Sequence, residues 1–350
     1  MITLVTGATG FLGSHVARQL VARGEAVRVL VRPSSQSRAI EHLPVERVTG
    51  DLRDMASLYR AMEGAGRVYH VAADYRFGVR HPNEIYDSNV IGTRNLLQAA
   101  SRAGVERFIY TSSVATIAVP RNGQLPNEET VAGLEEMIGA YKRSKFLAEK
   151  EVFRAAADGL PVVVVNPTTP VGPGDWKPTP TGRVIVDFLN GRMPGYVDTG
   201  LNIVPVEDAA AGHLLAAERG QVGQRYILGG RNMTLKEILN ALSAISGRPA
   251  PRLRLPHAVA LAAGHVDRLA SFLLRREPQI ALESVRMARH KMFVDASKAG
   301  RELGFVAGSA EQALERAVRW YEENGYVSAR QARSAARARA GKEDSTSAGQ

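Results

Sequence analysis

The sequence predicts a doubly wound, parallel α/β sheet followed by a smaller lobe of mixed structure. Over the first 168 residues, apolar runs typical of buried strands alternate with segments that have the apolar spacing of helices. The first of these strands leads through a glycine-rich turn into a helix, which is how a Rossmann-type fold begins. Beyond residue 168 the alternation weakens and proline and glycine become frequent, which indicates a change of architecture.

The expected strands are short runs rich in valine, whose branched side chains suit a buried, pleated surface. They span residues 2–5, 26–31, 45–48, 68–71, 107–111 and 162–165. Helices are expected where apolar residues recur three and four positions apart. In the first half these are 14–23, 55–62, 84–103 and a segment around 141–145. In the second half they are 206–219, 235–246 and 310–324.

The turn after the first strand carries three glycines in the spacing Gly-x-x-Gly-x-x-Gly. Glycines there allow a tight turn, close approach of the backbone to a pyrophosphate, and close packing of helix on strand. The start of the helix adds free N–H groups and the positive end of its dipole, both suited to phosphate. We therefore predict a dinucleotide site formed by Gly7, Thr9, Gly10, Phe11, Leu12 and Gly13.

Arg32 follows the second expected strand, nineteen positions after Gly13. An acidic side chain at this position binds the adenine ribose hydroxyls of NAD, whereas an arginine accommodates the 2′-phosphate of NADP. Ser34, Ser35 and Arg38 continue in a polar loop, and no carboxylate stands at the strand end. The sequence favours NADP over NAD as the cofactor.

Two further strand ends carry residues suited to the cofactor. Asp51 and Leu52 follow the third strand, where the Asp51 carboxylate would meet the adenine amino group or would cap the helix 55–62; both interpretations stay open. Ala72 and Ala73 follow the fourth strand, and their small side chains would let the backbone pass close to the cofactor. His70 in that strand is interpreted as a packed residue rather than a base.

Tyr141 and Lys145 lie four positions apart on an expected helix and so share one face. A free tyrosine has a pKa of about 10, and a nearby ammonium would lower it. The lysine would also donate to the nicotinamide ribose hydroxyls. Ser113, at the end of the fifth strand, would hydrogen-bond a substrate oxygen; Ser112 takes this place if the register differs by one. Together they supply an acid–base, its tuning cation and a polarising donor beside a hydride carrier.

Composition narrows the remaining classes of function. The 350 residues include no cysteine and eight scattered histidines, so thiol chemistry is excluded and no metal site is expected. The net charge of +10 comes with no aromatic and basic recognition motif. It therefore suits an anionic cofactor, an anionic substrate or an acidic membrane surface better than nucleic acid. Because the first strand starts at residue 2, we expect no signal peptide and a cytoplasmic protein.

The second half holds two unusual segments. Residues 170–182 are rich in proline and glycine, typical of a lid or binding loop. Residues 255–274 are apolar but interrupted by His257, His265, Asp267 and Arg268, too often for a membrane span. We expect an amphipathic helix that covers the substrate cleft or touches a membrane surface, and favour a buried helix. With the basic tail, this segment would allow weak contact with a membrane surface.

These observations divide the chain into three regions. Residues 1–168 form the dinucleotide-binding Rossmann-type domain, to which residues 200–230 return. Residues 169–327 form a smaller, mixed substrate-binding lobe. Residues 328–350 are rich in Ala, Arg and Ser and are expected to be a disordered basic tail.

The chain resembles the extended short-chain dehydrogenase/reductases over roughly residues 1–325. The resemblance rests on the stretches 6–13, 51–52, 72–73, 111–113 and 141–145. Within that superfamily the sequence is more similar to the dihydroflavonol reductase and 3β-hydroxysteroid dehydrogenase branch than to the sugar-nucleotide epimerases. The segments 72–76, 177–182 and 196–201 are similar to the bacterial family named hopanoid-associated sugar epimerase.

The resemblance implies a role for each site residue. Tyr141 would be the acid–base, Lys145 the cation that binds cofactor and lowers the tyrosine pKa, and Ser113 the donor that orients substrate. Thr168 and the neighbouring backbone, including Pro167, would contact the nicotinamide carboxamide. A homodimer through the helices 84–103 and 140–157 is also usual for such proteins.

The leading hypothesis is an NADP-preferring oxidoreductase that acts on a secondary alcohol or ketone, in hopanoid or other lipid and sugar metabolism. The alternative enzyme is an epimerase that retains NAD and recycles the hydride; Arg32 argues against it, because a permanently bound cofactor is usually NAD. A non-catalytic dinucleotide sensor or scaffold is a third hypothesis. Ser113, Tyr141 and Lys145 argue against that one, because a sensor has no need of them.

Overall fold

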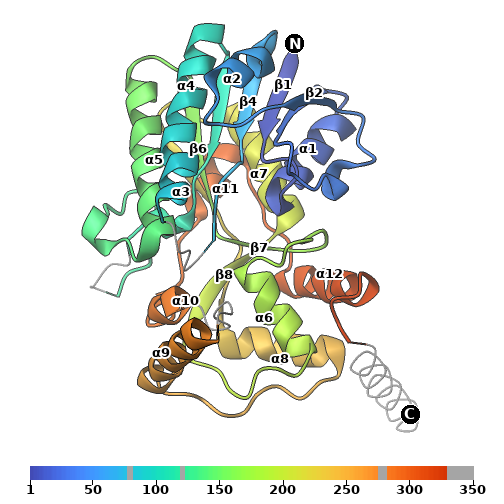
Figure 1. Ribbon diagram of the computed structural model, residues 1–350, viewed down its shortest axis with the longest axis vertical. Helices are drawn as coiled ribbons and strands as arrows, with labels where there is room; N and C mark the ends of the chain where they lie inside the picture. Colours follow the sequence, from blue (N-terminus) through green and yellow to red (C-terminus); the bar gives the residue numbers. More distant parts are fainter. Residues whose placement is uncertain (77–81, 119–122, 275–281, 329–350) are drawn as a thin grey trace.

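The computed structural model describes residues 1–76, 82–118, 123–274 and 282–328, and it confirms the predicted fold class. Seven strands form one sheet, and four further strands form a second sheet in a smaller lobe. The carboxyl ends of the large sheet point toward that lobe (Figure 1). The predicted tail lies outside the described residues, except for Ser328.

The large sheet is parallel throughout, in the order β3-β2-β1-β4-β5-β6-β9. Its strands are β1 Ile2–Thr6, β2 Ala26–Val31, β3 Glu46–Thr49, β4 Ala65–His70, β5 Arg107–Thr111, β6 Val162–Pro167 and β9 Arg225–Leu228. The order reverses direction at β1, whose neighbours are β2 and β4. Such a switch point leaves a crevice at the carboxyl ends of the strands, where ligands of open α/β sheets bind.

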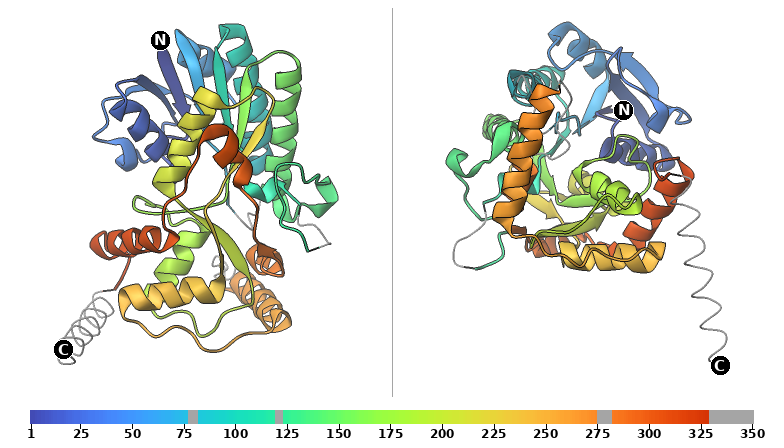
Figure 2. Two further views of the ribbon diagram at one scale, coloured as in Figure 1. Left: turned by 180° about the vertical axis from the view of Figure 1, so that it is seen from behind. Right: turned by 60° about the horizontal axis from the view of Figure 1, so that its bottom comes forward.

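Helices cover both faces of this sheet, which explains why its strands read as continuous apolar runs. One face packs against α1 Phe11–Ala22, α7 Val206–Arg219 and α11 Ser297–Leu303. The other packs against α2 Met55–Met62, α4 Gly92–Ala103 and α5 Gly139–Ala157. The two views in Figure 1 and the left of Figure 2 show these layers from opposite sides.

The expected helix 84–103 contains a π turn. It is built from α3 Pro82–Tyr86, the π turn Asp87–Ile91 and then α4. The turn carries Asn89, whose amide group donates to the Asp74 carbonyl and to Ser144 Oγ, each at 2.9 Å, and whose Oδ1 accepts from the Asp74 N–H at 2.7 Å. Through these bonds the π turn joins the end of β4 to the helix that carries Tyr141. Such turns widen a helix locally and often occur at functional sites.

The small lobe is built around the second sheet. Its strands are β7 Thr169–Val171, β8 Gly200–Pro205, β10 Arg231–Thr234 and β11 Lys291–Met292. Its helices are α6 Pro180–Leu189, α8 Leu235–Ser246, α9 His257–Leu273, α10 Leu282–Met287 and α12 Ala310–Glu323. Two predicted boundaries need correction. Residues 200–205 belong to this second sheet, so that only α7 and β9 return to the large one, and α11 packs on the large sheet.

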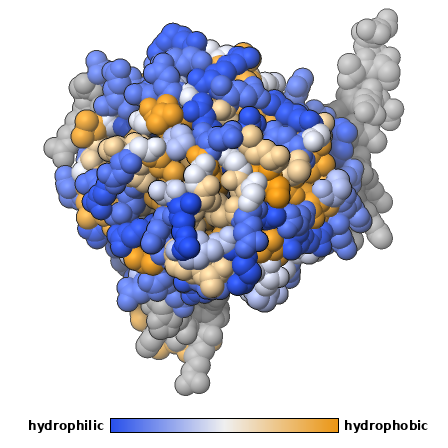
Figure 3. Space-filling view, turned by 90° about the horizontal axis from the view of Figure 1, so that it is seen from above, coloured by the Kyte–Doolittle hydropathy of each residue, from blue (hydrophilic) through white to orange (hydrophobic). Residues whose placement is uncertain are grey.

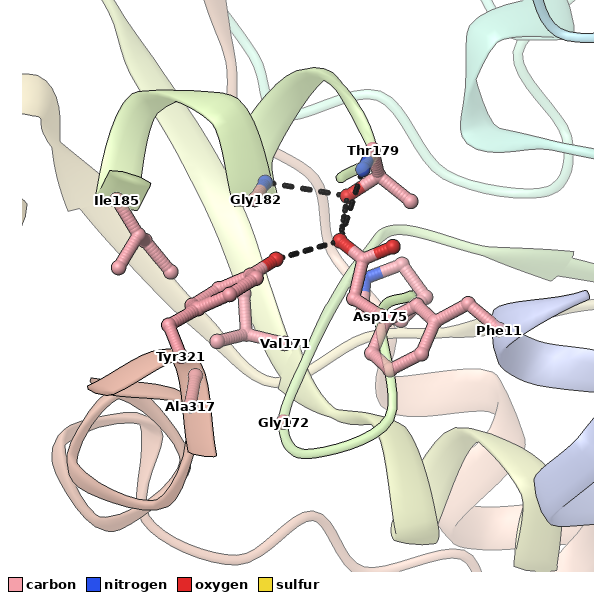
Figure 4. A pocket seen from close by; sticks show the side chains of 10 residues that line it. Phe11, Val171, Gly172, Asp175, Thr179, Gly182, Ile185, Ala317 and Tyr321 are labelled. Carbon is pink, nitrogen blue, oxygen red and sulfur yellow. Dashed lines mark hydrogen bonds between the residues drawn. The ribbon is translucent and has the colours of Figure 1, made fainter. Parts of the chain in front are cut away.

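The segment expected as a lid or binding loop instead ties the two lobes together (Figure 4). The carboxylate of buried Asp175 accepts hydrogen bonds at 2.8 Å from the backbone N–H and the hydroxyl of Thr179 and from Tyr321 Oη of α12. Phe11, at the start of α1, lines the same small space. One turn later His15 Nε2 lies 2.9 Å from the Pro173 carbonyl oxygen. Helix α1, which follows the glycine turn, is therefore fixed against the small lobe.

Helix α9 corrects another expectation. The segment 255–274 does form a helix, but the favoured interpretation as a buried helix is wrong, because Val259, Val266, Leu269 and Leu273 are more than half exposed. The helix lies at the edge of the small lobe and packs on the short helix α10, which covers only one side of it.

Replacing Tyr321 by Phe tests the hydrogen-bonded Asp175 cluster of the small lobe, beside which Phe11 of α1 lies. The substitution removes a donor to a carboxylate whose other oxygen, Oδ1, has no hydrogen-bond partner among the described residues. We expect the free energy of unfolding to fall by about 1–3 kcal/mol, measured by urea denaturation. Tyr59→Phe is the control, since the Tyr59 hydroxyl makes no hydrogen bond to the described part of the chain. Equal losses in both variants would contradict the assignment.

Candidate active site

The glycine turn is shaped by the contact of three backbone segments. Gly7 has φ +75°, and a Cβ there would lie 2.6 Å from the Ala72 nitrogen at the end of β4. A Cβ on Gly13 would lie 2.2 Å from the Gly7 carbonyl oxygen. Gly10, the N-cap of α1, is exposed, and its helix has no side-chain cap. The first N–H groups of α1 are thus left for an anion, which fits a dinucleotide pyrophosphate with Thr9, Phe11 and Leu12 around it.

The ends of β2 and β3 carry a cluster of charges. Arg32 is exposed, directly after β2. The Arg53 guanidinium donates to both oxygens of Asp51, from Nε at 2.9 Å and Nη2 at 2.8 Å. This pairing, assisted by the charge of Arg32, holds the pKa of Asp51 at about 2. The cap of α2 is Asp54, which accepts from the Ala56 N–H, so the alternative capping role of Asp51 is wrong.

Leu52 and the two alanines form the rim of the crevice. Leu52 is buried against Gly92 of α4. Ala72 and Ala73 follow β4 and are half-buried, and the Ala72 N–H donates to Thr6 Oγ1 at 3.4 Å. Beneath them His70 lies between the Thr6 and Thr93 hydroxyls. Burial and the charge of Lys145 lower the pKa of His70 to about 3, so its imidazole is a neutral, packed group.

Ser113 and Tyr141 are brought together. Ser113 follows β5 in an extended conformation and caps the 3₁₀ turn Val114–Thr116 by accepting from the Ala115 N–H. Its hydroxyl lies close enough to the Tyr141 phenol to lower the pKa of that phenol. The Ser112 hydroxyl is buried and has no hydrogen-bond partner in the described ranges. The structure thus places Ser113, not Ser112, beside the phenol.

Lys145 is buried one turn further along α5. Its Nζ donates to the Thr111 carbonyl oxygen at 2.7 Å and to Tyr110 Oη at 3.0 Å. An ammonium has three donors, so one is left for another acceptor such as a ribose hydroxyl. Burial lowers the pKa of Lys145 to about 7, against the opposing effect of the Glu149 carboxylate.

Burial also raises the pKa of Tyr141 above 10, and the neighbouring Ser113 hydroxyl offsets only part of this rise. Both groups are removed from water, which penalises the phenolate and the ammonium alike. The lowering of the tyrosine pKa by Lys145 therefore stays a prediction. Lys145 is moreover held by Tyr110 and Thr111 of β5.

A second group of buried polar residues supports these three, and the sequence analysis missed it. Glu149 accepts from the Thr116 hydroxyl at 3.0 Å and from the Asn166 amide at 3.1 Å, and it pairs with Arg225. The same Asn166 amide donates to the Ser113 carbonyl oxygen. Glu149 was detectable, because it follows Lys145 by the same four positions that separate Lys145 from Tyr141.

Pro167 and Thr168 mark the end of β6. Pro167 is buried and pairs with Leu228. The N–H and the hydroxyl of Thr168 both donate to the Leu228 carbonyl oxygen, at 3.2 and 3.4 Å. These two donors are directed at β9, so contact of Thr168 with a nicotinamide carboxamide stays a prediction.

Comparison with known sequences agrees with this geometry. Residues 3–229 match the family described as "NAD dependent epimerase/dehydratase family". A Synechocystis protein whose provisional name is dihydroflavonol 4-reductase is 46% identical over 327 residues, covering 92% of this chain and 95% of its own. "Sterol demethylase protein B" of Methylococcus capsulatus is 40% identical over 331 residues, covering 93% and 100%.

Solved structures show the same similarity. The protein gox2253 is 44% identical, with a TM-score of 0.84, over 93% of this chain and 99% of its own. PA4631 of Pseudomonas aeruginosa, described as a nucleoside-diphosphate-sugar epimerase, is 31% identical, with a TM-score of 0.79, over 94% and 99%. The chain belongs to the NAD dependent epimerase/dehydratase family of extended short-chain dehydrogenase/reductases, and is an NAD(P)-dependent enzyme of the reductase, dehydrogenase or epimerase type.

Proposed function

We propose that this enzyme is an NADP-preferring reductase that interconverts a ketone and a secondary alcohol, with Tyr141 as its acid–base. The observation that carries the proposal is the proximity of the Ser113 hydroxyl, at the carboxyl end of β5, to the Tyr141 phenol, one helical turn from buried Lys145. A donor and a proton carrier thus lie close together, and a basic side chain follows on the same helix.

NADPH, when bound, supplies a hydride to the carbonyl carbon. The residues of the chain handle the oxygen. Ser113 donates a hydrogen bond to it and aligns it with the phenol, and Tyr141 gives its proton to the oxygen as negative charge develops there. Lys145, whose third donor remains available, binds the ribose of the cofactor and stabilises the phenolate that is left. In the direction of oxidation, the phenolate takes the alcohol proton back.

The charges around Arg32 support NADP rather than NAD. Arg32 is exposed at the strand end and offers its guanidinium to a 2′-phosphate. The nearby carboxylate of Asp51 is neutralised by Arg53, so it would repel a phosphate only weakly.

The substrate that we propose is an apolar, lipid-like ketone, as the similarity to hopanoid-associated proteins suggests. The names of two relatives support this class, one being the sterol demethylase protein and the other, from Stigmatella aurantiaca, a ketoreductase of a farnesylated quinoline oxide that is 30% identical. A sugar epimerase is the second candidate, favoured by the similarity to PA4631 and the activity for which that protein is named.

Arg32→Asp tests the cofactor. We expect the purified protein to emerge without bound dinucleotide and to bind NADPH more tightly than NADH. The variant should weaken NADPH binding by about tenfold or more and leave NADH binding similar or stronger, in fluorescence titrations. Arg60→Asp, which makes the same change of charge on α2, is the control. Stoichiometric NAD that survives gel filtration would instead support the epimerase.

Tyr141→Phe tests the acid–base. Turnover of a ketone substrate should fall by about 10²–10⁴-fold, while NADPH binding stays close to that of the parent protein. The matched pair Ser113→Ala and Ser112→Ala separates the serines: only the first should slow turnover, because only Ser113 contacts the phenol. Full activity of Tyr141→Phe would remove Tyr141 from this role.

The lysine predicts a pH dependence of cofactor binding. Lys145 has a lowered pKa of about 7 in the free protein, and the cofactor phosphates would favour its ammonium form and raise that pKa. The complex then holds more protons, so NADPH affinity should increase as pH falls from 9 toward 7, with proton uptake on binding. Calorimetry in buffers of different ionisation enthalpy measures this uptake. In Lys145→Met the uptake should disappear, and its persistence would assign it to another group.

A further inference from the structure

Helix α9 exposes a row of apolar side chains to solvent. Besides His265 and Arg268, its exposed residues are alanine, valine and leucine, at positions 258, 259, 262, 263, 266, 269 and 273. Val266 is 67% exposed, Leu269 62% and Leu273 71%. The spacing of three and four places these residues on one face, a continuous apolar stripe along the helix. We call these seven residues the α9 stripe.

The covered side of α9 mixes Leu261 and two alanines with polar groups. His257 Nε2 lies 2.8 Å from the Val285 carbonyl oxygen, Ser271 is buried, and Asp267 is half-buried. A helix on the surface of a globular protein usually has its apolar stripe facing the core instead. The right view of Figure 2 shows α9 along an outer edge of the small lobe.

The surroundings of the stripe are strongly basic. Between residues 247 and 292 the sequence has nine arginines and lysines and three acidic residues. In the described part of this segment, Arg252, Arg268, Arg286 and Arg289 are exposed, whereas Arg254 and Lys291 share an ion pair with Asp198. By contrast, the surface at the far end of the large sheet is mostly hydrophilic, with apolar residues in small groups (Figure 3).

We propose that the α9 stripe docks this enzyme on the surface of an anionic lipid membrane. An apolar helix face flanked by arginines and lysines is the arrangement with which interfacial helices enter the headgroup region of anionic bilayers. A second copy of this chain fits less well, because a symmetric contact through the stripe would bring the same positive charges together. Among the described helices none is long and apolar enough to cross a bilayer.

Docking there would bring the membrane close to the catalytic helix. α9 packs on α10, and a Cβ on Gly139 would lie 2.8 Å from the Glu283 carboxylate of α10. Gly139 opens α5, two residues before Tyr141. The inference itself concerns binding alone and does not depend on the reaction proposed above.

The test is flotation of the full-length protein with vesicles. We expect it to bind vesicles of phosphatidylcholine mixed with phosphatidylglycerol at low salt and to be released at about 1 M salt, where the Debye length is about 3 Å. Val266→Ser/Leu269→Ser should lower the partition coefficient by about tenfold or more, since two side chains no longer enter the lipid. Val306→Ser, at a valine that is 82% exposed on another part of the surface, should bind like the parent protein.

Three results would overturn the proposal. The first is absence of binding to the anionic vesicles at low salt. The second is binding that does not depend on the stripe. The double substitution would then leave binding unchanged, or deletion of residues 329–350 would abolish it because the tail is the contact. The third is sedimentation showing that Val266→Ser/Leu269→Ser dissociates an oligomer, because the stripe would then be covered by a second copy of the chain. Circular dichroism of the variants confirms that they are folded.

Discussion

The close contact of β1, β4 and α1 at two glycines is the constraint on which the rest of the structure depends. A side chain at Gly7 would meet the backbone of Ala72, and one at Gly13 would meet the carbonyl of Gly7. Because neither residue has a side chain, α1 can start close enough to the sheet to present its N–H groups at the switch point. The same placement sets His15 against Pro173 and Phe11 beside Asp175. The placement of α1 by these two glycines thus shapes the predicted phosphate site and also joins the two lobes.

Around this frame, the chemistry is governed by desolvation. Tyr141 and Lys145 are both buried, and burial makes the neutral phenol and the neutral amine more favourable than in water. The site counters this penalty with fixed groups: Ser113 on the phenol, the Thr111 carbonyl and Tyr110 hydroxyl on the amine, and the Glu149 carboxylate one turn away. A bound dinucleotide would add its own charges to this balance, so the pKa values of the proposed acid–base pair would depend on the complex rather than on the protein alone.

The sequence allowed prediction of what depends on local pattern. Parallel strands, their helices and the residues at strand ends follow from periodicity and from the glycine spacing, and helices such as α7 and α8 have the expected limits. A local pattern that two residues satisfy left the cap of α2 undecided: Asp54 caps the helix, while Asp51 pairs with Arg53. Features set by tertiary contacts were missed. The pairing of β8 with β7 and β10, and the outward turn of the α9 stripe, depend on partners distant in the chain.

The distribution of charge connects the dinucleotide site with the α9 stripe. Of the net charge of +10, +6 lies in residues 247–292 and +3 in residues 329–350, so the remaining chain, which contains the whole Rossmann-type sheet, is nearly neutral. A pyrophosphate site made of glycine backbone and a helix N-terminus needs no excess of arginine or lysine, because its positive potential comes from N–H dipoles. The basic residues near α9 therefore do not serve the cofactor. They belong to the same segment as an apolar helix face that is exposed, and an anionic interface is the environment in which both features become favourable.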